Sequence, residues 1–247
     1  SDLMTKNLTD FFLSLLIIIL IAPFLFIVLF LVYLQDFNSP FYVAKRVGRG
    51  GKLFKMYKIR SMIIGADLTG VDSTSSDDQR ITKIGHFIRK FKVDELSQLI
   101  NVILGNMSLV GPRPNVLRET NLYTTEEKLI LTIKPGITDF SSIVFSDEGE
   151  ILEGSDDPDL DYNQLIRPWK SRLALIYVNQ KSFFLDLYIL FLTGISFINK
   201  EFSRKKISKY LESINCEKEI INVVLREGPL IKGIPPGASE IVTTRNI

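Results

Sequence analysis

An uncharged run of 24 residues, Phe11 to Leu34, constrains this chain more than any other feature of its sequence. As a helix rising about 1.5 Å per residue it reaches about 36 Å, which exceeds the roughly 30 Å hydrocarbon core of a bilayer. A secretory signal peptide is a poor match, because the run is too long and no small-residue cleavage site follows it. The run therefore predicts a membrane helix.

Pro23 lies in the middle of this run. Proline removes one backbone hydrogen bond and clashes with the carbonyl four residues earlier, so a kink is expected there. Two arrangements stay open: a kinked helix that crosses the membrane, and a re-entrant helix that leaves by the face it entered. Positions 40–60 hold seven basic residues and no acidic one, which predicts a cytoplasmic location for the bulk of the chain. The basic residues are Lys45, Arg46, Arg49, Lys52, Lys55, Lys58 and Arg60.

Composition limits the chemistry that the chain can perform. Its 247 residues are 46% hydrophobic, which suits one domain of catalytic size joined to a membrane anchor. Cys216 is the only cysteine, which excludes an internal disulfide framework and a Cys-rich metal site. His86 is the only histidine, so a histidine triad or a multi-histidine zinc site cannot form within one chain. Acids, bases and nucleophiles must come from carboxylates, Lys, Tyr, Ser or His86.

Two carboxylates, Asp94 and Glu95, stand at the head of a predicted helix. The apolar residues that follow recur at the spacing of one buried helix face, and Gly105 ends the pattern. These apolar residues are Leu96, Leu99, Ile100, Ile103 and Leu104. In the first turn, Asp94 and Glu95 would accompany unpaired N–H groups and the positive end of the helix dipole, which form an anion site. An ordinary acidic cap also explains them, so both interpretations stay open at this point.

A glycine-rich basic turn at 47–51 separates two short segments with alternating apolar residues, which predicts a β-hairpin. Such a turn suits phosphate binding or contact with anionic lipid headgroups, although it matches neither a P-loop nor a dinucleotide fingerprint. The polar segment 65–79 is expected to form a surface loop or lid. A short basic helix carrying Arg89 is predicted over 81–91.

Arg113 lies between two prolines in the sequence Gly-Pro-Arg-Pro. A backbone restricted in this way presets the guanidinium fork for a phosphate or a carboxylate, although an ordinary rigid turn gives the same pattern. The acidic segment 147–161 is expected to form an exposed loop. Asp186 is the lone charge in an apolar helix rich in aromatic residues, a composition typical of the membrane interface. It is a candidate for the functional site or for a salt bridge to Lys or Arg.

Four segments resemble, in order and spacing, the bacterial sugar transferases, which are monotopic polyprenyl-phosphate phosphoglycosyl transferases. The resemblance covers about Pro40 to Thr193, and the Asp-Glu-Leu-x-Gln-Leu motif followed by Met-Ser-Leu-Val-Gly-Pro-Arg-Pro is highly specific. The segments are PFYVAKRVGRGGKLFKMYKIRSM, RITKIGHFIRKFKVDELSQLINVILGNMSLVGPRP, KPGITDFSSI and SFFLDLYIL.

The resemblance implies transfer of a sugar-1-phosphate from a UDP-sugar to undecaprenyl phosphate, with Mg²⁺ as cofactor and release of UMP. By position, Asp94 resembles the nucleophile, Glu95 its metal-associated partner and Arg113 the phosphate-binding arginine. Further phosphate or carboxylate partners implied in this way are Lys58, Arg60 and Arg89. Asp186 is a candidate second metal ligand. The enzyme is expected at the cytoplasmic face of the bacterial inner membrane, in contact with membrane lipid, where Pro23 breaks a re-entrant anchor and leaves both termini cytoplasmic.

Some positions depart from the family pattern. Lys92 and Val93 replace a Ser-Leu pair before the two carboxylates, and Ser97 stands where proline is usual. Asp139 replaces a usual glycine, and Ala22 replaces a serine before Pro23. None of these changes removes a charged catalytic group, so the chemistry is expected to survive, while the identity of the sugar stays open.

The sequence thus predicts a mainly helical α+β fold with a membrane anchor at 1–39, a catalytic domain at 40–195 and a C-terminal extension at 196–247. The anchor is expected to be a re-entrant helix, and the domain to contain a small hairpin and interfacial amphipathic helices. Nucleic acid is not an expected partner, and a homodimer is left open. Two other function classes remain: a membrane-anchored, metal-dependent hydrolase of nucleotide-sugars or lipid pyrophosphates, and a non-enzymatic polysaccharide assembly protein.

Overall fold

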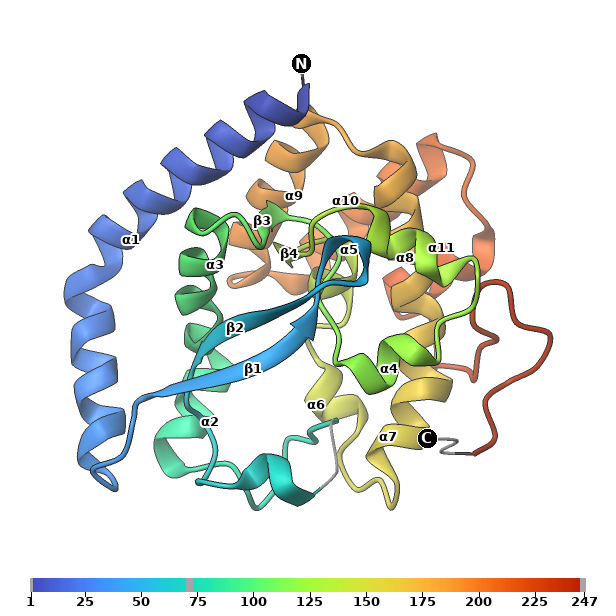
Figure 1. Cartoon of the computed structure of the whole chain (residues 1–247). Helices are drawn as coiled ribbons and strands as arrows, with labels where there is room; N and C mark the ends of the chain where they lie inside the picture. Colours follow the sequence, from blue (N-terminus) through green and yellow to red (C-terminus); the bar gives the residue numbers. More distant parts are fainter. Residues whose placement is uncertain (1, 70–72, 245–247) are drawn as a thin grey trace.

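The computed structural model describes residues 2–69 and 73–244. In this part the chain is mainly helical, with two small two-stranded sheets and one long apolar N-terminal helix, which confirms the predicted class (Figure 1). The α-helices are α1 Asp2–Leu34, α2 Lys83–Lys90, α3 Leu99–Ile103, α4 Leu117–Asn121, α5 Phe140–Val144, α6 Glu148–Ile151, α7 Pro158–Asp161, α8 Arg167–Gln180, α9 Phe183–Ser196, α10 Lys200–Ser213 and α11 Lys218–Leu225. The strands are β1 Phe41–Val47, β2 Leu53–Ile59, β3 Ser108–Val110 and β4 Gly136–Thr138. Shorter 3-10 helices are η1 Arg49–Gly51, η2 Ala66–Thr69, η3 Val93–Gln98 and η4 Glu127–Thr132, and η5 Tyr162–Ile166 is a π-helix.

The predicted membrane helix is confirmed as a helix and extends further towards the N-terminus than the uncharged run. Among the described residues, it is the one helix that is long and apolar enough to cross a membrane. Pro23 lies inside it, and Figure 1 shows α1 following a curved path so that both of its ends meet the rest of the chain. Near its C-terminal end, Val28 and Val32 pack against Ile59, Ile88 and Val93.

The predicted hairpin is also confirmed. Strands β1 and β2 pair antiparallel, with Phe41 opposite Ile59 and Val47 opposite Leu53. Gly50 and Gly51 in the connecting turn have positive φ, a conformation that side-chain-bearing residues rarely adopt. The hairpin therefore owes its tight turn to these glycines.

A parallel pair of short strands, β3 and β4, brings the Gly-Pro-Arg-Pro loop beside the Lys-Pro-Gly turn at 134–136. The backbones of Gly111 and Gly136 approach so closely that a Cβ on Gly136 would lie 2.1 Å from the Gly111 amide nitrogen. The Gly136 amide donates to the Pro112 carbonyl at 2.9 Å. This contact sets the backbone from which Arg113 projects.

The hydrophobic core lies among the helices of the C-terminal half. Its largest fully buried side chains are aromatic residues of α5 and α8, namely Phe140, Trp169 and Tyr177. Ile207 of α10 and Val224 of α11 are completely buried in the same cluster. Helices α10 and α11 therefore share one core with α5 and α8.

Two expectations about local structure are wrong. The helix expected after the two carboxylates is split into η3 and α3, and two residues of its predicted buried stripe, Ile100 and Leu104, are 37% and 59% exposed. A five-residue α-helix is too short to bury a stripe two turns long. The acidic segment contains α6 and α7 rather than an exposed loop. Asp159 within it is buried, and its carboxylate accepts a hydrogen bond from the Ser73 amide at 2.8 Å.

Candidate active site

Asp94 and Glu95 lie in the first turn of η3, as the sequence predicts. Lys92 precedes that turn in the left-handed conformation, with a φ of 52°. The buried side chain of Asn101 ties the following helix to β2, because it donates to the Lys55 carbonyl at 2.7 Å and accepts from the Tyr57 amide at 2.9 Å. The sequence analysis did not identify Asn101, because a single asparagine in an apolar helix gives no sign of its hydrogen-bond partners.

That connection places Lys58 of β2 against Asp94. Their side chains form an ion pair, with 3.2 Å between Lys58 Nζ and Asp94 Oδ2. Burial lowers the pKa of Lys58, and the Asp94 carboxylate opposes the change by stabilising the charged amine. Asp94 is only 7% exposed, so most of its surface is enclosed by the protein.

Glu95 is paired with Arg113 from the Gly-Pro-Arg-Pro loop, with 2.7 Å between Glu95 Oε1 and Arg113 Nη2. Burial disfavours the charged carboxylate, but Arg113, Lys92 and Lys58 outweigh burial and lower the pKa of Glu95 to about 2. The Glu95 carboxylate in turn raises the pKa of Arg113. Both groups are therefore held in their charged forms.

Two further basic residues, Arg89 and Lys92, belong to the same charged cluster. Arg89 Nε donates to Ser61 Oγ at 3.0 Å, and burial lowers its pKa while Asp94 opposes that shift. Burial also lowers the pKa of Lys92, with Glu95 acting in the opposite direction. The structure thus brings the predicted Arg89 into the cluster and adds Lys92, which sequence analysis treated only as a departure from the family pattern.

A third carboxylate, Glu148, lies close enough to act on the same charges. It forms an ion pair with Lys170 of α8. Burial raises the pKa of Glu148, but Lys170, Arg113 and Lys92 outweigh burial and lower it overall. Sequence reasoning missed Glu148 because it lies in a segment expected to be an exposed acidic loop.

The cluster carries more positive than negative charge. Its five basic side chains are Lys58, Arg89, Lys92, Arg113 and Lys170, and its three carboxylates are Asp94, Glu95 and Glu148. An excess of Lys and Arg around these carboxylates suits a ligand with several negative charges, such as a diphosphate.

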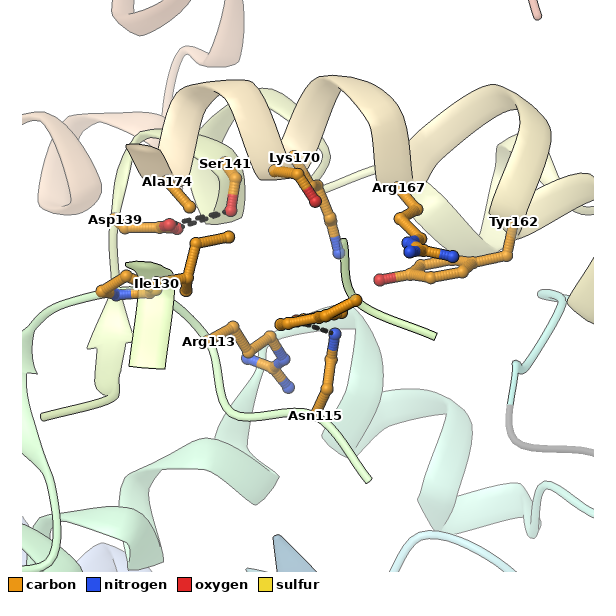
Figure 2. Close-up of a pocket in the computed structure, with 12 residues that line it drawn as sticks. Arg113, Asn115, Ile130, Asp139, Ser141, Tyr162, Arg167, Lys170 and Ala174 are labelled. Carbon is orange, nitrogen blue, oxygen red and sulfur yellow. Dashed lines mark hydrogen bonds between the residues drawn. The ribbon is translucent and has the colours of Figure 1, made fainter. Parts of the chain in front are cut away.

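A pocket adjoins Arg113. Figure 2 shows Arg113 and Asn115 below it, with Lys170 of α8 and Tyr162 of η5 on the opposite wall. Asp139, at the end of β4, also lines the pocket, but its carboxylate accepts from Ser141 Oγ and from the backbone and side chain of Ser142, all within 2.9 Å. This residue, a departure from the family pattern, caps α5.

Arg60 and Asp186 have partners outside this cluster. Arg60 is 5% exposed and contacts both carboxylate oxygens of Asp36 at 2.5 and 2.6 Å. One oxygen of Asp186 pairs with Lys6, and the other accepts from Tyr177 Oη at 2.6 Å. These contacts hold the two ends of α1, and a role for either residue at a phosphate or a metal remains a prediction.

Among residues 2–69 and 73–244, no group of three or more His, Cys, Asp or Glu side chains is arranged to hold a metal ion by itself. The adjacent carboxylates of Asp94 and Glu95 still offer oxygen ligands. Mg²⁺ is commonly bound by one or two carboxylates together with substrate phosphates, so this donor set suits Mg²⁺ bound with a ligand.

Comparison with known proteins gives a consistent family. A family model described as bacterial sugar transferase matches residues 1–200. The chain is 34% identical over 204 residues to the UDP-glucose:undecaprenyl-phosphate glucose-1-phosphate transferase of Klebsiella pneumoniae, covering 81% of this chain and 41% of that protein. It is 36% identical over 170 residues to the galactosyl transferase CpsE of Streptococcus agalactiae serotype III, covering 64% of this chain and 34% of that protein.

A third relative is matched over nearly its whole length. The exopolysaccharide production protein PSS of Rhizobium leguminosarum bv. phaseoli is 34% identical over 206 residues, which is 79% of this chain and 96% of that protein. By contrast, the chain spans about a third of the streptococcal relative and two fifths of the Klebsiella relative.

Proposed function

Because the chain belongs to the bacterial sugar transferase family, we propose that it transfers a sugar-1-phosphate from a UDP-sugar to undecaprenyl phosphate and releases UMP. The names of two relatives, from Klebsiella pneumoniae and from Salmonella typhimurium, state transfer to undecaprenyl phosphate. One observation carries the proposal: the buried carboxylate of Asp94 is enclosed by a cluster with excess positive charge, next to the Glu95–Arg113 pair. Both substrates of the proposed reaction are phosphate anions.

Asp94 is the nucleophile of this mechanism. Its carboxylate attacks the β-phosphorus of the UDP-sugar, the bond from that phosphorus to the UMP oxygen breaks, and an aspartyl phosphosugar forms. A phosphate oxygen of undecaprenyl phosphate then attacks the same phosphorus and displaces Asp94 as a carboxylate. Lys58 orients Asp94 through their ion pair, in which Nζ and Oδ2 are 3.2 Å apart. Arg113 and Arg89 stabilise the negative charge on the phosphoryl group during its transfer.

Mg²⁺ belongs to this proposal, with Glu95 as the residue that holds it. Arg113 Nη2 contacts Oε1 of Glu95 at 2.7 Å, and a carboxylate has two oxygens, so Glu95 can serve both Arg113 and a cation. Bound Mg²⁺ supplies positive charge to the pyrophosphate oxygens. Asp186 is not included as a ligand, because Lys6 and Tyr177 already engage both of its oxygens.

We also propose that α1 is a re-entrant membrane anchor. A straight helix of 33 residues would separate its ends by about 50 Å, yet Lys6 near one end and Asp36 beyond the other pair with residues of the same folded body. The middle of the helix is exposed and apolar, with Phe26 72% exposed. We therefore place the middle in the membrane and both ends at the cytoplasmic face.

Exposed apolar residues near α9 extend the membrane-facing surface. Phe184, Phe191 and Ile198 are all largely exposed. Aromatic and aliphatic side chains of this kind favour the boundary between headgroups and acyl chains. This surface would set the active site close to the headgroup of the lipid acceptor.

The function is tested by incubating purified protein with a panel of UDP-sugars and Mg²⁺, with and without undecaprenyl phosphate, and measuring UMP and lipid-linked sugar. We expect a burst of UMP stoichiometric with enzyme before lipid is added, and the mass of a phosphosugar on Asp94 but not on an Asp94→Asn variant. Release of free sugar phosphate without lipid product would identify a hydrolase instead. If UMP appeared only when both substrates were present, the covalent intermediate would be abandoned and direct transfer retained.

Membrane topology has a separate test. With Cys216 replaced, a single cysteine at position 5 should resist a membrane-impermeant reagent added to intact cells and react after lysis. Labelling in intact cells would show that α1 crosses the membrane.

A further inference from the structure

Two arginines from the C-terminal helices converge on a single carboxylate. Arg204 of α10 and Arg226 at the end of α11 each place Nη2 2.9 Å from an oxygen of Asp147. The same two nitrogens also donate to the Val144 carbonyl, at 3.1 and 3.0 Å. Both arginines lie beyond residue 200, where the match to the family model ends.

This arrangement is costly for the fold. Both guanidinium groups are about five-sixths buried, and three of their nitrogens have no hydrogen-bond partner: Arg204 Nε, Arg226 Nε and Arg226 Nη1. Arg226 also adopts a positive φ of 58° and stacks 4.6 Å over the ring of Phe145. Buried charges with unsatisfied donors lower stability, and such costs are commonly retained where a position must be held for function.

The segment held by these arginines leads directly into the active site. Asp147 occupies the N-cap position of α6, and its side chain contacts the arginines rather than the helix. The next residue is Glu148, whose side chain pairs with Lys170 and interacts with the charges of Arg113 and Lys92. The Glu148 amide donates to the Phe145 carbonyl at 3.1 Å. Fixing Val144 and Asp147 therefore fixes the backbone that presents the third carboxylate of the site.

We propose that the C-terminal helices position Glu148 in the active site through Arg204, Arg226 and Asp147. Glu148 then holds the Lys170 ammonium beside Arg113, so that the two cations face the diphosphate in a defined arrangement. Arg204, Arg226 and Asp147 are positioning residues: they contact no substrate and act through Glu148. The kinetic test of this inference rests on the proposed transferase function. A second test, by hydrogen exchange, does not depend on that function.

The kinetic test uses the full-length protein in lipid nanodiscs with Arg204→Gln, Arg226→Gln and the double variant. Lys205→Gln is the matched control, because Lys205 is a basic residue next to Arg204 on α10, its side chain is 62% exposed, and it forms an exposed ion pair with Glu201. We expect KM for the UDP-sugar to rise about fivefold or more in the double variant, which corresponds to roughly 1 kcal/mol, with a smaller change in kcat. The control should match the parent protein.

A double-mutant cycle distinguishes positioning from a general loss of structure. In a Glu148→Gln background, the arginine substitutions should cause little further rise in KM, because the group they position is already neutral. Asp147→Asn, which keeps the shape of the side chain, should raise KM as the arginine substitutions do. This variant provides the same test if the double arginine variant fails to fold. Equal fold-changes in both backgrounds would overturn the proposal.

Hydrogen exchange gives the readout that does not depend on activity. Amides of residues 145–151 should exchange faster in the double variant and in Asp147→Asn than in the parent or in Lys205→Gln, while the amides of α8 stay protected. Unchanged exchange in this segment would overturn the proposal even in a protein that proved to be an active transferase. Faster exchange in a protein without UMP release would uphold the positioning and reject the proposed function instead.

Discussion

Lys58 Nζ lies 3.2 Å from Asp94 Oδ2, across the junction between a hairpin strand and the turn that carries both carboxylates. The pair joins the most basic segment of the chain to its proposed nucleophile. The contact depends on Asn101, whose amide group bonds to the strand on both sides of Met56. The position of Asp94 therefore depends on a hydrogen-bonded side chain outside the charged cluster.

Replacing Asn101 with alanine should impair both stability and turnover. The change removes two partly buried hydrogen bonds, to the Lys55 carbonyl and from the Tyr57 amide, at a cost of about 1–3 kcal/mol. We expect a lower thermal midpoint and a lower kcat for UMP release, measured on the fraction that remains folded. Asn106→Ala, at an exposed position of the following turn, is the control. Wild-type turnover in Asn101→Ala would show that the strand does not position Asp94.

Arg113→Lys should weaken turnover strongly although the charge is retained. A lysine ammonium cannot reproduce the planar fork that holds Glu95 at 2.7 Å and a phosphate at the same time. The expected loss in kcat/KM is on the order of tenfold to a hundredfold. A near-normal rate would remove Arg113 from the phosphate site.

Removing divalent cations should abolish activity without unfolding the protein. In our proposal Mg²⁺ is held by Glu95 together with substrate phosphates, and Glu95 keeps Arg113 as its partner when the metal is removed. We expect EDTA to stop UMP release, and excess Mg²⁺ to restore it, with an unchanged thermal midpoint throughout. Glu95→Gln should lose most Mg²⁺-dependent activity. Full activity in EDTA would refute the metal requirement.

Arg60→Lys and Asp36→Asn should both loosen the end of α1. Hydrogen bonds from Arg60 hold the pKa of the Asp36 carboxyl below its usual value of 3.8. A lowered pKa in the folded state means that the pairing stabilises the protein above about pH 4 and that this contribution is lost as the pH falls through the lowered value. We expect a lower thermal midpoint at pH 7 and near-normal KM in both variants. A large rise in KM for Arg60→Lys alone would place Arg60 at the substrate after all.

Features that depend on neighbouring residues were predictable from the sequence. The hairpin follows from a glycine-rich turn between alternating segments, and α1 from an unbroken apolar run. The inclusion of Asp94, Glu95 and Arg113 in one site came from the resemblance to a family. The residues alone also fitted an ordinary helix cap at Asp94 and Glu95 and an ordinary rigid turn at Arg113.

Features that depend on distant partners were not predictable. Arg60 meets Asp36 and Asp186 meets Lys6 across long stretches of chain, so a charge count could not assign those partners. Glu148 could not be identified from the sequence, because its partner Lys170 lies 22 residues further along the chain. The strands β3 and β4 are three residues each and pair across more than two dozen residues, which leaves no local signal.

The contact between Gly111 and Gly136 has a consequence for how this chain can vary. A Cβ at position 136 would meet the Gly111 amide nitrogen at 2.1 Å, and that obstacle is backbone, which no rotamer change can relieve. Even alanine would force the two turns apart and carry the Arg113 loop with them. In a saturation library selected for activity, position 136 should therefore tolerate glycine alone, whereas the exposed glycine at 194, where a Cβ meets nothing within 4 Å, should accept many residues.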